Sequence, residues 1–291
     1  MKTICLKTLI ISLFIGLFPL TQSAQTPSYF MHNNLTFLWE TSQKLKIPES
    51  VYYDQADAIL YISNINGKPT AKDGNGFISK VGLDGEIRKL KWADGMHAPK
   101  GMGKFGEYLY VTDIDRVHKI KVATGEIVKS FFVEEAKFLN DIAVHASGDV
   151  FVSDMQTSKI YRIHNNSIRQ WLDNGKLERT NGLYATDDYL YIGMAGQIIR
   201  VGYGDKIIKP FIGKTVSVDG LEHFTNDYFL FSDWQGRVYS ASPDAAPVKL
   251  LDSRSVNKNA ADIEFDRGQN ILFVPTFMGN TVAAYKVSGI P

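Results

Sequence analysis

Short apolar runs recur along the chain about every 40 residues. Each run is continuous rather than alternating, which is typical of a strand that is buried on both faces. No stretch carries the 3.6-residue apolar period of an amphipathic helix. The six runs are 59–63, 108–112, 150–153, 189–192, 228–232 and 271–274.

A second β-like segment follows each apolar run. In several repeats a turn signal separates this segment from the last strand of the same repeat. Asp84-Gly85, Thr124-Gly125 and Gly204-Asp205 are such signals, because these residues favour tight hairpin turns. The following segments are 76–81, 116–121, 159–163, 197–201, 236–240 and 281–285. Repeats of this length and strand content predict an all-β fold, a six-bladed β-propeller with one blade per repeat.

The last repeat is one strand short, and a strand without a repeat of its own lies near the start of the chain. Residues 35–40 (Leu-Thr-Phe-Leu-Trp-Glu) are rich in β-forming residues. We therefore expect this N-terminal strand to complete the last blade, which closes the ring and removes exposed sheet edges. The prediction is a single propeller domain over residues 35–291.

The residues before this domain predict a secretory signal and a tether. Lys2 and Lys7 precede an apolar run, 8–20, and small polar residues follow it up to Ala24. This layout predicts a signal peptide over 1–24, a tether over 25–34, a secreted or periplasmic protein and no stable membrane insertion after cleavage. The only cysteine, Cys5, falls within the signal, so the mature chain is expected to have no disulfide.

Charge and composition narrow the possible partners. The chain has 32 basic and 31 acidic residues, a formal net charge of +1, and 44% hydrophobic residues. No strong positive field is present to attract nucleic acid, so nucleic-acid binding is disfavoured. A small-molecule substrate at the mouth of the propeller channel is the expected partner.

A polar residue stands where each predicted inner strand begins. In a propeller the inner strands line the channel, so six such residues would form a ring near one mouth. Two carboxylates and two carboxamides in this ring offer only oxygen ligands, which select calcium, with magnesium or another divalent ion as alternatives. The ring residues are Glu49, Lys100, Asn140, Asn181, Asp219 and Asp262.

The loops after the second strands are expected to surround the same mouth. They alternate carboxylates with large apolar groups, which suits a mainly apolar substrate with a polar reacting centre. We expect Trp234 and Met194 from these loops to bind substrate, together with Asn140 and with His97, which lies just before the second blade. The longest loop, 66–75, is a candidate lid.

The ring residues resemble a known family. Pro48-Glu49, Asn140-Asp141, Asn181-Gly182 and 219–221 (Asp-Gly-Leu) are similar to the blade starts of the gluconolactonase/senescence-marker-protein family, which is related to diisopropyl fluorophosphatase and the paraoxonases. The resemblance implies a calcium-type metal held by Glu49, Asn181 and Asp219, with Asn140 as a ligand or substrate contact. It also implies hydrolysis of a lactone or ester-like bond, with Asp219 as base or nucleophile.

Two residues depart from that family pattern. Sugar lactonases of the family carry an arginine where this chain has Phe138, which favours a less polar substrate. Lys100 in the ring either orients a substrate carboxylate or phosphoryl group or replaces the metal charge. Asp262 is expected to balance Lys100, and both are candidate catalytic residues; a structural ion pair between them is the alternative.

The sequence therefore predicts a calcium-dependent hydrolase of the lactonase type, acting on a lactone, ester or phosphoester. The alternative is a non-catalytic propeller that binds a ligand or protein across its mouth, since propellers serve both roles. A metal-free propeller enzyme, as in the strictosidine synthases, is a third option, against which the two amides Asn140 and Asn181 argue.

Overall fold

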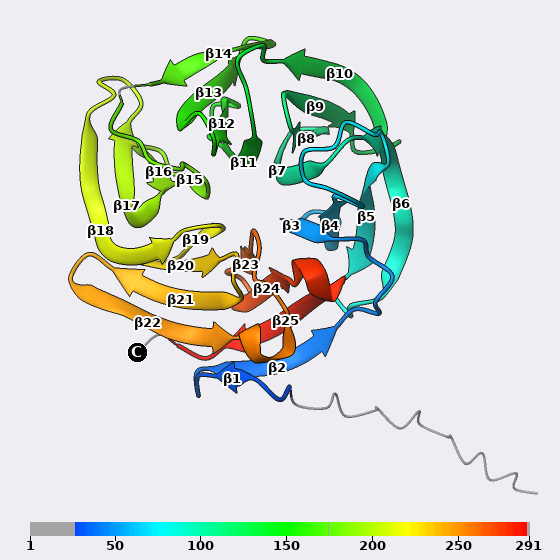
Figure 1. Cartoon of the computed structure of the whole chain (residues 1–291), viewed down its shortest axis with the longest axis vertical. Coiled ribbons are helices and arrows are strands. Elements are labelled where there is room, and N and C mark those ends of the chain that lie inside the picture. Colours follow the sequence, from blue (N-terminus) through cyan, green and yellow to red (C-terminus); the bar gives the residue numbers. More distant parts are fainter. Residues whose placement is uncertain (1–26, 174, 290–291) are drawn as a thin grey trace, which may run out of the picture.

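Six antiparallel β-sheets stand like blades around a central channel in the computed structural model, which describes residues 27–173 and 175–289 (Figure 1). Each blade has an inner strand, two middle strands and an outer strand. The inner strands are β3 (Pro48–Asp54), β7 (Pro99–Phe105), β11 (Leu139–Val144), β15 (Leu183–Ala185), β19 (Leu221–Thr225) and β23 (Glu264–Asp266). The predicted six-bladed propeller is confirmed.

The second strands are the six apolar runs of the sequence, and they are buried almost throughout because neighbouring blades pack on both faces. They are β4 (Ile59–Asn64), β8 (Tyr108–Asp113), β12 (Val150–Asp154), β16 (Tyr189–Gly193), β20 (Tyr228–Asp233) and β24 (Ile271–Pro275). The third strands are β5 (Gly76–Gly82), β9 (Arg116–Lys121), β13 (Lys159–His164), β17 (Ala195–Gly202), β21 (Arg237–Ser242) and β25 (Val282–Val287).

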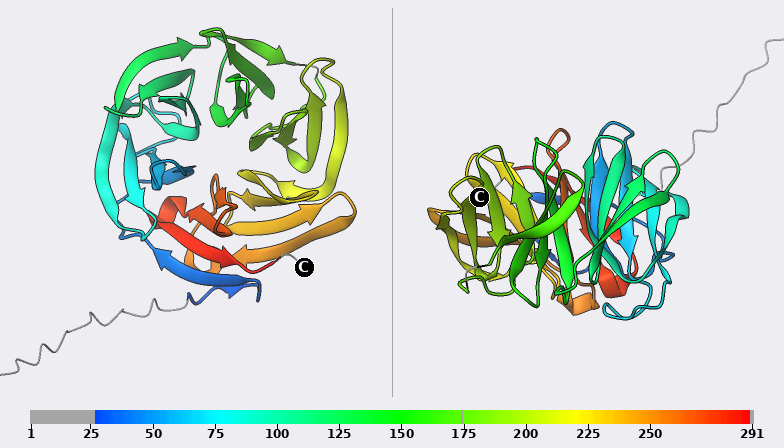
Figure 2. Two further views of the ribbon diagram at one scale, coloured as in Figure 1. Left: turned by 180° about the vertical axis from the view of Figure 1, so that it is seen from behind. Right: turned by 90° about the horizontal axis from the view of Figure 1, so that it is seen from above.

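The outer strands carry more exposed side chains than the other strands, since they lie at the rim of the ring and meet solvent. They are β6 (Ile87–Met96), β10 (Glu126–Phe132), β14 (Ser167–Leu172), β18 (Ile208–Ser217), β22 (Ala245–Asp252) and, in the sixth blade, β2 (Leu35–Glu40). Two short 3-10 turns, η1 (Arg254–Val256) and η2 (Phe277–Gly279), lie in loops. Viewed from the side, loops project from both faces of the ring (Figure 2).

The N-terminal strand closes the ring as predicted. β2 pairs antiparallel with β25, so the first and last parts of the described chain share the sixth blade. Phe37 and Tyr285 meet edge-to-face across this pair, with ring centroids 5.9 Å apart. Closure leaves no blade without an outer strand.

Part of the expected tether is structured. β1 (Phe30–Met31) pairs with β22 and adds a fifth strand to the fifth blade. Tyr29 is buried beside it and its hydroxyl hydrogen-bonds to that of Tyr285 in the next blade. The outer edge of β22 offers unpaired backbone groups, which explains why the chain pairs here before it reaches β2.

The predicted signal peptide, 1–24, lies outside the described residues. Across 27–173 and 175–289, no helix has the length and apolar character that a membrane span requires.

Candidate functional site

In the first three blades the inner strand begins with a register irregularity, where two of its residues face one residue of the second strand. In the first blade Pro48 pairs with Asn64 and Val51 pairs with Ile62, so two residues of β3, Glu49 and its successor, face a single residue of β4. Such a bulge turns consecutive side chains in different directions. The second and third blades repeat the pattern.

In the first five blades the residue at the start of the inner strand reaches a cavity at one mouth of the channel, here called the mouth cavity. Its volume is about 710 Å³. Five of the six predicted ring residues line it: Glu49, Lys100, Asn140, Asn181 and Asp219. The structure therefore brings together the complete predicted metal-ligand set and the predicted catalytic Asp219 and Lys100.

Asp262 is absent from this cavity, because the expected register is wrong by one residue in the sixth blade. The backbone N–H of Asp219 bonds to Ser232 on the second strand of its blade, and the corresponding bond in the sixth blade runs from Ala261 to Pro275. Ala261 thus occupies the ring position, buried against Ile65 and other apolar residues. Asp262 lies one residue further along the strand.

Glu49 has a buried carboxylate that is incompletely satisfied. Its Oε2 atom has no hydrogen-bond partner among the described residues, and the side chain is almost fully enclosed. Burial, and secondly the neighbouring Asp219, raise the pKa of Glu49 well above its usual value, while Lys100 opposes the shift. A buried carboxylate oxygen without a partner is costly, so this atom is a candidate ligand for a cation.

Asn181 and Asp219 form a hydrogen-bonded pair beside Glu49. The Asn181 amide Nδ2 donates to Asp219 Oδ1 over 2.5 Å. Burial raises the pKa of Asp219 to about 7, although the bond from Asn181 lowers it. With its nitrogen turned to Asp219, the Asn181 amide keeps its carbonyl oxygen available as an acceptor.

Lys100 is held on the floor of the mouth cavity by the backbone just before its own strand. Its Nζ donates to the backbone oxygen of Ala98 over 2.8 Å and lies 4.5 Å from the ring centroid of Phe138. Burial lowers the pKa of Lys100, while Glu49 and Asp113 raise it. Phe138, the residue at the family's arginine position, therefore contacts the ammonium group instead of offering hydrogen bonds to a sugar.

Apolar side chains form the walls above this polar floor. Trp234 and Phe277 meet edge-to-face with ring centroids 5.5 Å apart, and Met278 beside them is 58% exposed. Trp234, a predicted substrate contact, lines the cavity and is 48% exposed. A polar floor beneath apolar walls fits a small, mainly apolar ligand with one polar reactive group.

Two other predicted substrate contacts lie elsewhere. Met194 is buried in the core between the third and fourth blades, packed with Leu177 and Leu190. The ring of His97 accepts a hydrogen bond from Gly74 N over 3.1 Å and so holds the loop 66–75. That loop reaches the cavity through Gly67 and Pro69, as expected of a lid.

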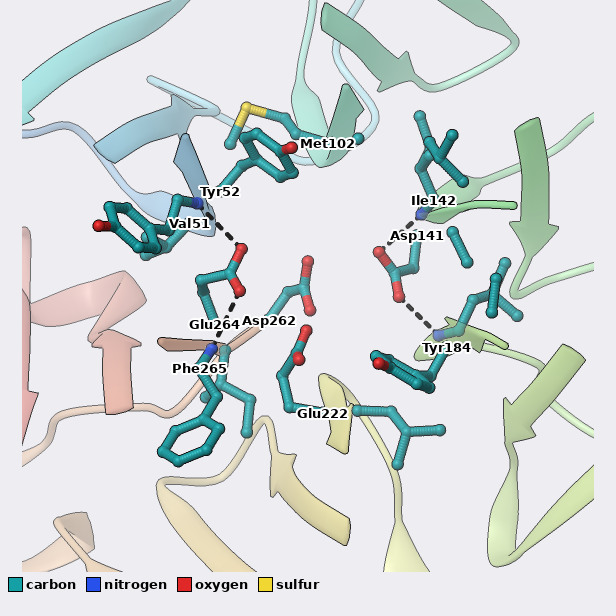
Figure 3. Close-up of a pocket in the computed structure, with 18 of the residues that line it drawn as sticks. Val51, Tyr52, Met102, Asp141, Ile142, Tyr184, Glu222, Asp262, Glu264 and Phe265 are labelled. Carbon is teal, nitrogen blue, oxygen red and sulfur yellow. Dashed lines mark hydrogen bonds between the residues drawn. The ribbon is translucent and has the colours of Figure 1, made fainter. Parts of the chain in front are cut away.

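Residues further along the inner strands line another cavity, here called the channel cavity, of about 360 Å³. Four carboxylates point into it (Figure 3): Asp141, Glu222, Asp262 and Glu264. Ser50 Oγ donates to Asp262 over 2.6 Å, and the backbone of Tyr53 donates to Glu264 over 2.9 Å.

Burial is the main cause of raised pKa values in the channel cavity. It raises the pKa of Asp141 and that of Glu264 to about 7 each. The pKa values of Asp262 and Glu222 lie well above their usual range, where nearby Asp141 and Glu264, respectively, add to the effect of burial. Lys104 and Arg267 at the margin supply positive charge.

The mouth cavity fits a hard divalent cation by its chemistry. No three Asp, Glu, His or Cys side chains in the described chain are arranged to hold a metal. The candidate set combines two carboxylates with two carboxamides, and oxygen ligands of both kinds serve calcium. The unpartnered Oε2 of Glu49 is the observation in favour of the fit.

Sequence reasoning did not single out several charged residues of the two cavities. Arg179 and Arg237 line the mouth cavity, and Glu222 and Glu264 line the channel cavity. For the two glutamates a signal was present, since each stands among apolar residues of an inner strand. Arg179 lies in a loop and Arg237 is the first residue of β21. At such positions the sequence does not indicate where a side chain points.

Comparison with known proteins identifies the fold and no family. No protein-family model matches the chain, and no curated protein matches its sequence. The resemblance to the gluconolactonase family therefore remains a prediction from the short motifs.

Solved structures with a similar fold include lyases. A catalytically inactive variant of virginiamycin B lyase from Staphylococcus aureus with quinupristin matches with a TM-score of 0.60 and 15% identity, over 87% of this chain and 98% of that one. A streptogramin B lyase matches with a TM-score of 0.63 and 12% identity, over 87% and 97%. Selenomethionine-substituted virginiamycin B lyase from Staphylococcus aureus gives 0.62 and 14%, over 87% and 98%.

Proposed function

We propose that the protein is an enzyme for a small molecule, and that it is a calcium-dependent hydrolase of a lactone, ester or phosphoester. The observation that carries the proposal is the buried, unpartnered Oε2 of Glu49, in the same cavity as Asp219, Asn140 and Asn181. Apolar walls above these groups suit a ligand that presents one polar group to the floor.

Glu49, Asn140, Asn181 and Asp219 are the residues that would hold the ion. When bound, calcium would supply Lewis-acid polarisation of a carbonyl or phosphoryl oxygen.

The chain's own residues have separate roles in this proposal. Asn181 fixes the orientation of Asp219 through the 2.5 Å hydrogen bond, so the second oxygen of Asp219 is free to take a proton from water or to attack the substrate. Lys100 uses one of its three donors on Ala98 and keeps two for a substrate oxygen. Trp234 and Phe277 exclude water from one side of the reacting group.

Thermal unfolding with calcium and with excess chelator tests the metal part of the proposal. A ligand that binds only the folded state at 100 times its dissociation constant stabilises it by about 2.7 kcal/mol. We expect calcium to raise the Tm of the wild type and to have little effect on Asp219→Asn. Asp262→Asn is the matched control, because it is the same substitution at a residue that lines the channel cavity and not the mouth cavity. A response lost in Asp262→Asn and kept in Asp219→Asn would contradict the assignment.

The reaction class is tested with lactone and ester substrates in ¹⁸O-labelled water. A hydrolase incorporates the label into its product, whereas a lyase, the activity named for the structural neighbours, cleaves its substrate without adding water. If the protein binds ligands but turns over no substrate, the alternative of a non-catalytic binding platform would be favoured. The feature that supports this alternative is Lys100 in the ring.

A further inference from the structure

Arg179 lines the mouth cavity with a guanidinium group that has no protein partner. No hydrogen bond or ion pair joins this group to any residue in 27–173 or 175–289, although the Arg179 backbone N–H donates to Ser158 Oγ over 2.9 Å. Its φ is +51°, in the left-handed region that glycine or asparagine occupies at lower cost. An arginine at this position strains the backbone, and its exposed guanidinium makes no ion pair within the described chain.

The other arginine of the cavity is paired with a carboxylate. Arg237 Nε donates to Asp233 over 2.6 Å, and a second nitrogen of its guanidinium donates to Gln235 over 3.1 Å. The Asp233 carboxylate is therefore balanced by Arg237 and does not serve Arg179. The two arginines of one cavity thus differ, and only Arg179 is available to a ligand.

The balance of charges in the mouth cavity favours a negatively charged ligand. Beyond the Asp233–Arg237 pair, the lining carries two carboxylates, Glu49 and Asp219, and two cationic groups, Lys100 and Arg179. A divalent cation bound as proposed would leave an excess of positive charge. Lys100 is buried, and a buried charge is costly unless an opposite charge accompanies it, whereas Arg179 is exposed and can reach a ligand from the solvent side. An anionic ligand would reduce that cost.

We propose that the ligand of the mouth cavity is an amphipathic carboxylate, with an apolar body against Trp234 and Phe277 and its carboxylate on Arg179. The proposal rests on the proposed function for the position of the site and adds the class of substrate. Arginine suits this role because its planar fork donates two parallel hydrogen bonds to a carboxylate. The ester or lactone that reacts at the floor is then a second group of the same molecule.

Calorimetric titration with a matched pair of probes tests the proposal. 4-Phenylbutanoate carries the carboxylate, and 4-phenylbutanamide has the same shape without the charge. We expect wild type to bind the carboxylate at least about fivefold more tightly than the amide, the factor that corresponds to about 1 kcal/mol for a partly exposed ion pair. The preference should disappear in Arg179→Gln and persist in part in Arg179→Lys.

Two further variants separate charge recognition from apolar contact. Trp234→Ala should weaken both probes by a similar factor and leave their ratio unchanged. Arg169→Gln removes an exposed arginine on the outer strand β14 and should leave both affinities unchanged. Equal wild-type affinity for the two probes, absence of binding by both, or a preference that survives in Arg179→Gln would overturn the proposal.

The titrations are made with calcium and with chelator, so the two proposals can fail separately. A carboxylate preference without any calcium response or hydrolysis would overturn only the calcium-dependent hydrolase. Calcium binding and hydrolysis without a carboxylate preference would overturn only the role of Arg179.

Discussion

Glu222 is a buried acid that the proposed chemistry does not use. It lies in the channel cavity, where Arg267 is 4.0 Å from its carboxylate and Glu264 adds negative charge. Burial is the first cause of its raised pKa, followed by Glu264. The charged form of Glu222 is thus disfavoured in the folded protein.

Glu222→Gln should increase stability at alkaline pH and have little effect in acid. The unfolded chain releases the Glu222 proton near its usual pKa of 4.5, whereas the folded protein retains it to higher pH. Stability from the protonated form is therefore present at low pH and lost as pH rises toward the folded pKa. We expect a clear gain in the free energy of unfolding at pH 8 and almost none at pH 4, from urea unfolding in chelator.

Glu126→Gln, at the exposed start of the outer strand β10, controls for the loss of one carboxylate. An equal effect of Glu222→Gln at the two pH values would show that the pKa of this carboxyl does not contribute to stability as described.

The position of Asp262 could have been predicted from the sequence. In the first five repeats one residue separates the polar ring residue from the first apolar residue of the inner strand, as in Asp219-Gly220-Leu221. In the sixth repeat Ile263 follows Asp262 directly, so an alignment on the apolar residue places Ala261 in the ring. The ring position was assigned to Asp262 because it is polar. That assignment was wrong because a shift of one residue along a strand reverses the direction of the side chain.

At the level of elements, two short N-terminal strands make different contributions. β2 completes the sixth blade, and β1 covers the edge of the fifth. The structure thus joins these two blades through a segment that belongs to neither repeat.

A chain that starts at residue 32 should fold with reduced stability. It lacks β1 and the buried Tyr29, and burial of one large aromatic side chain contributes about 1.5–3 kcal/mol. A chain that starts at residue 42 also lacks β2 and leaves β25 exposed, so it should aggregate or fail to fold. Circular dichroism melts and size-exclusion chromatography measure both. Equal melting of the chain from residue 32 and the chain from residue 27 would contradict the role given to β1.

The strands were predictable where burial decides them. Each second strand was predicted to within one residue at its C-terminal end, because packing on both faces requires a continuous apolar run. β1 was missed because two residues are too few to carry a pattern. Met194 and His97 were expected to bind substrate at the mouth and lie elsewhere. The direction of a loop side chain depends on the turn conformation, which the apolar periodicity does not predict.

At the scale of the whole molecule, the inner strands approach so closely that neighbouring blades meet backbone to backbone. A Cβ added at Gly220 would lie 2.4 Å from Ile263 N, and one added at Gly182 would lie 2.4 Å from Asp219 O. Both contacts join one blade to the next. Glycine at these positions sets how narrow the ring can be.

Gly220→Ala should destabilise the protein by about 3 kcal/mol, the upper part of the range for an overpacked site, because backbone atoms cannot yield as a side chain can. Gly204→Ala is the control, since a Cβ at Gly204 meets nothing within 4 Å. Chemical denaturation of both variants provides the comparison. A cost at Gly220 no larger than that at Gly204 would mean that the blades can move apart without loss.

The pairing of β2 with β25 also has a consequence for the order of events in synthesis. Strand β2 finds its partner only after β25 has left the ribosome. Until then the sixth blade lacks its outer strand, and apolar surface on the flanking blades is exposed. Native pairing between segments this distant in sequence also forms slowly. The ring can therefore close only after residue 287 has left the ribosome, and the unfinished propeller exposes apolar surface until then.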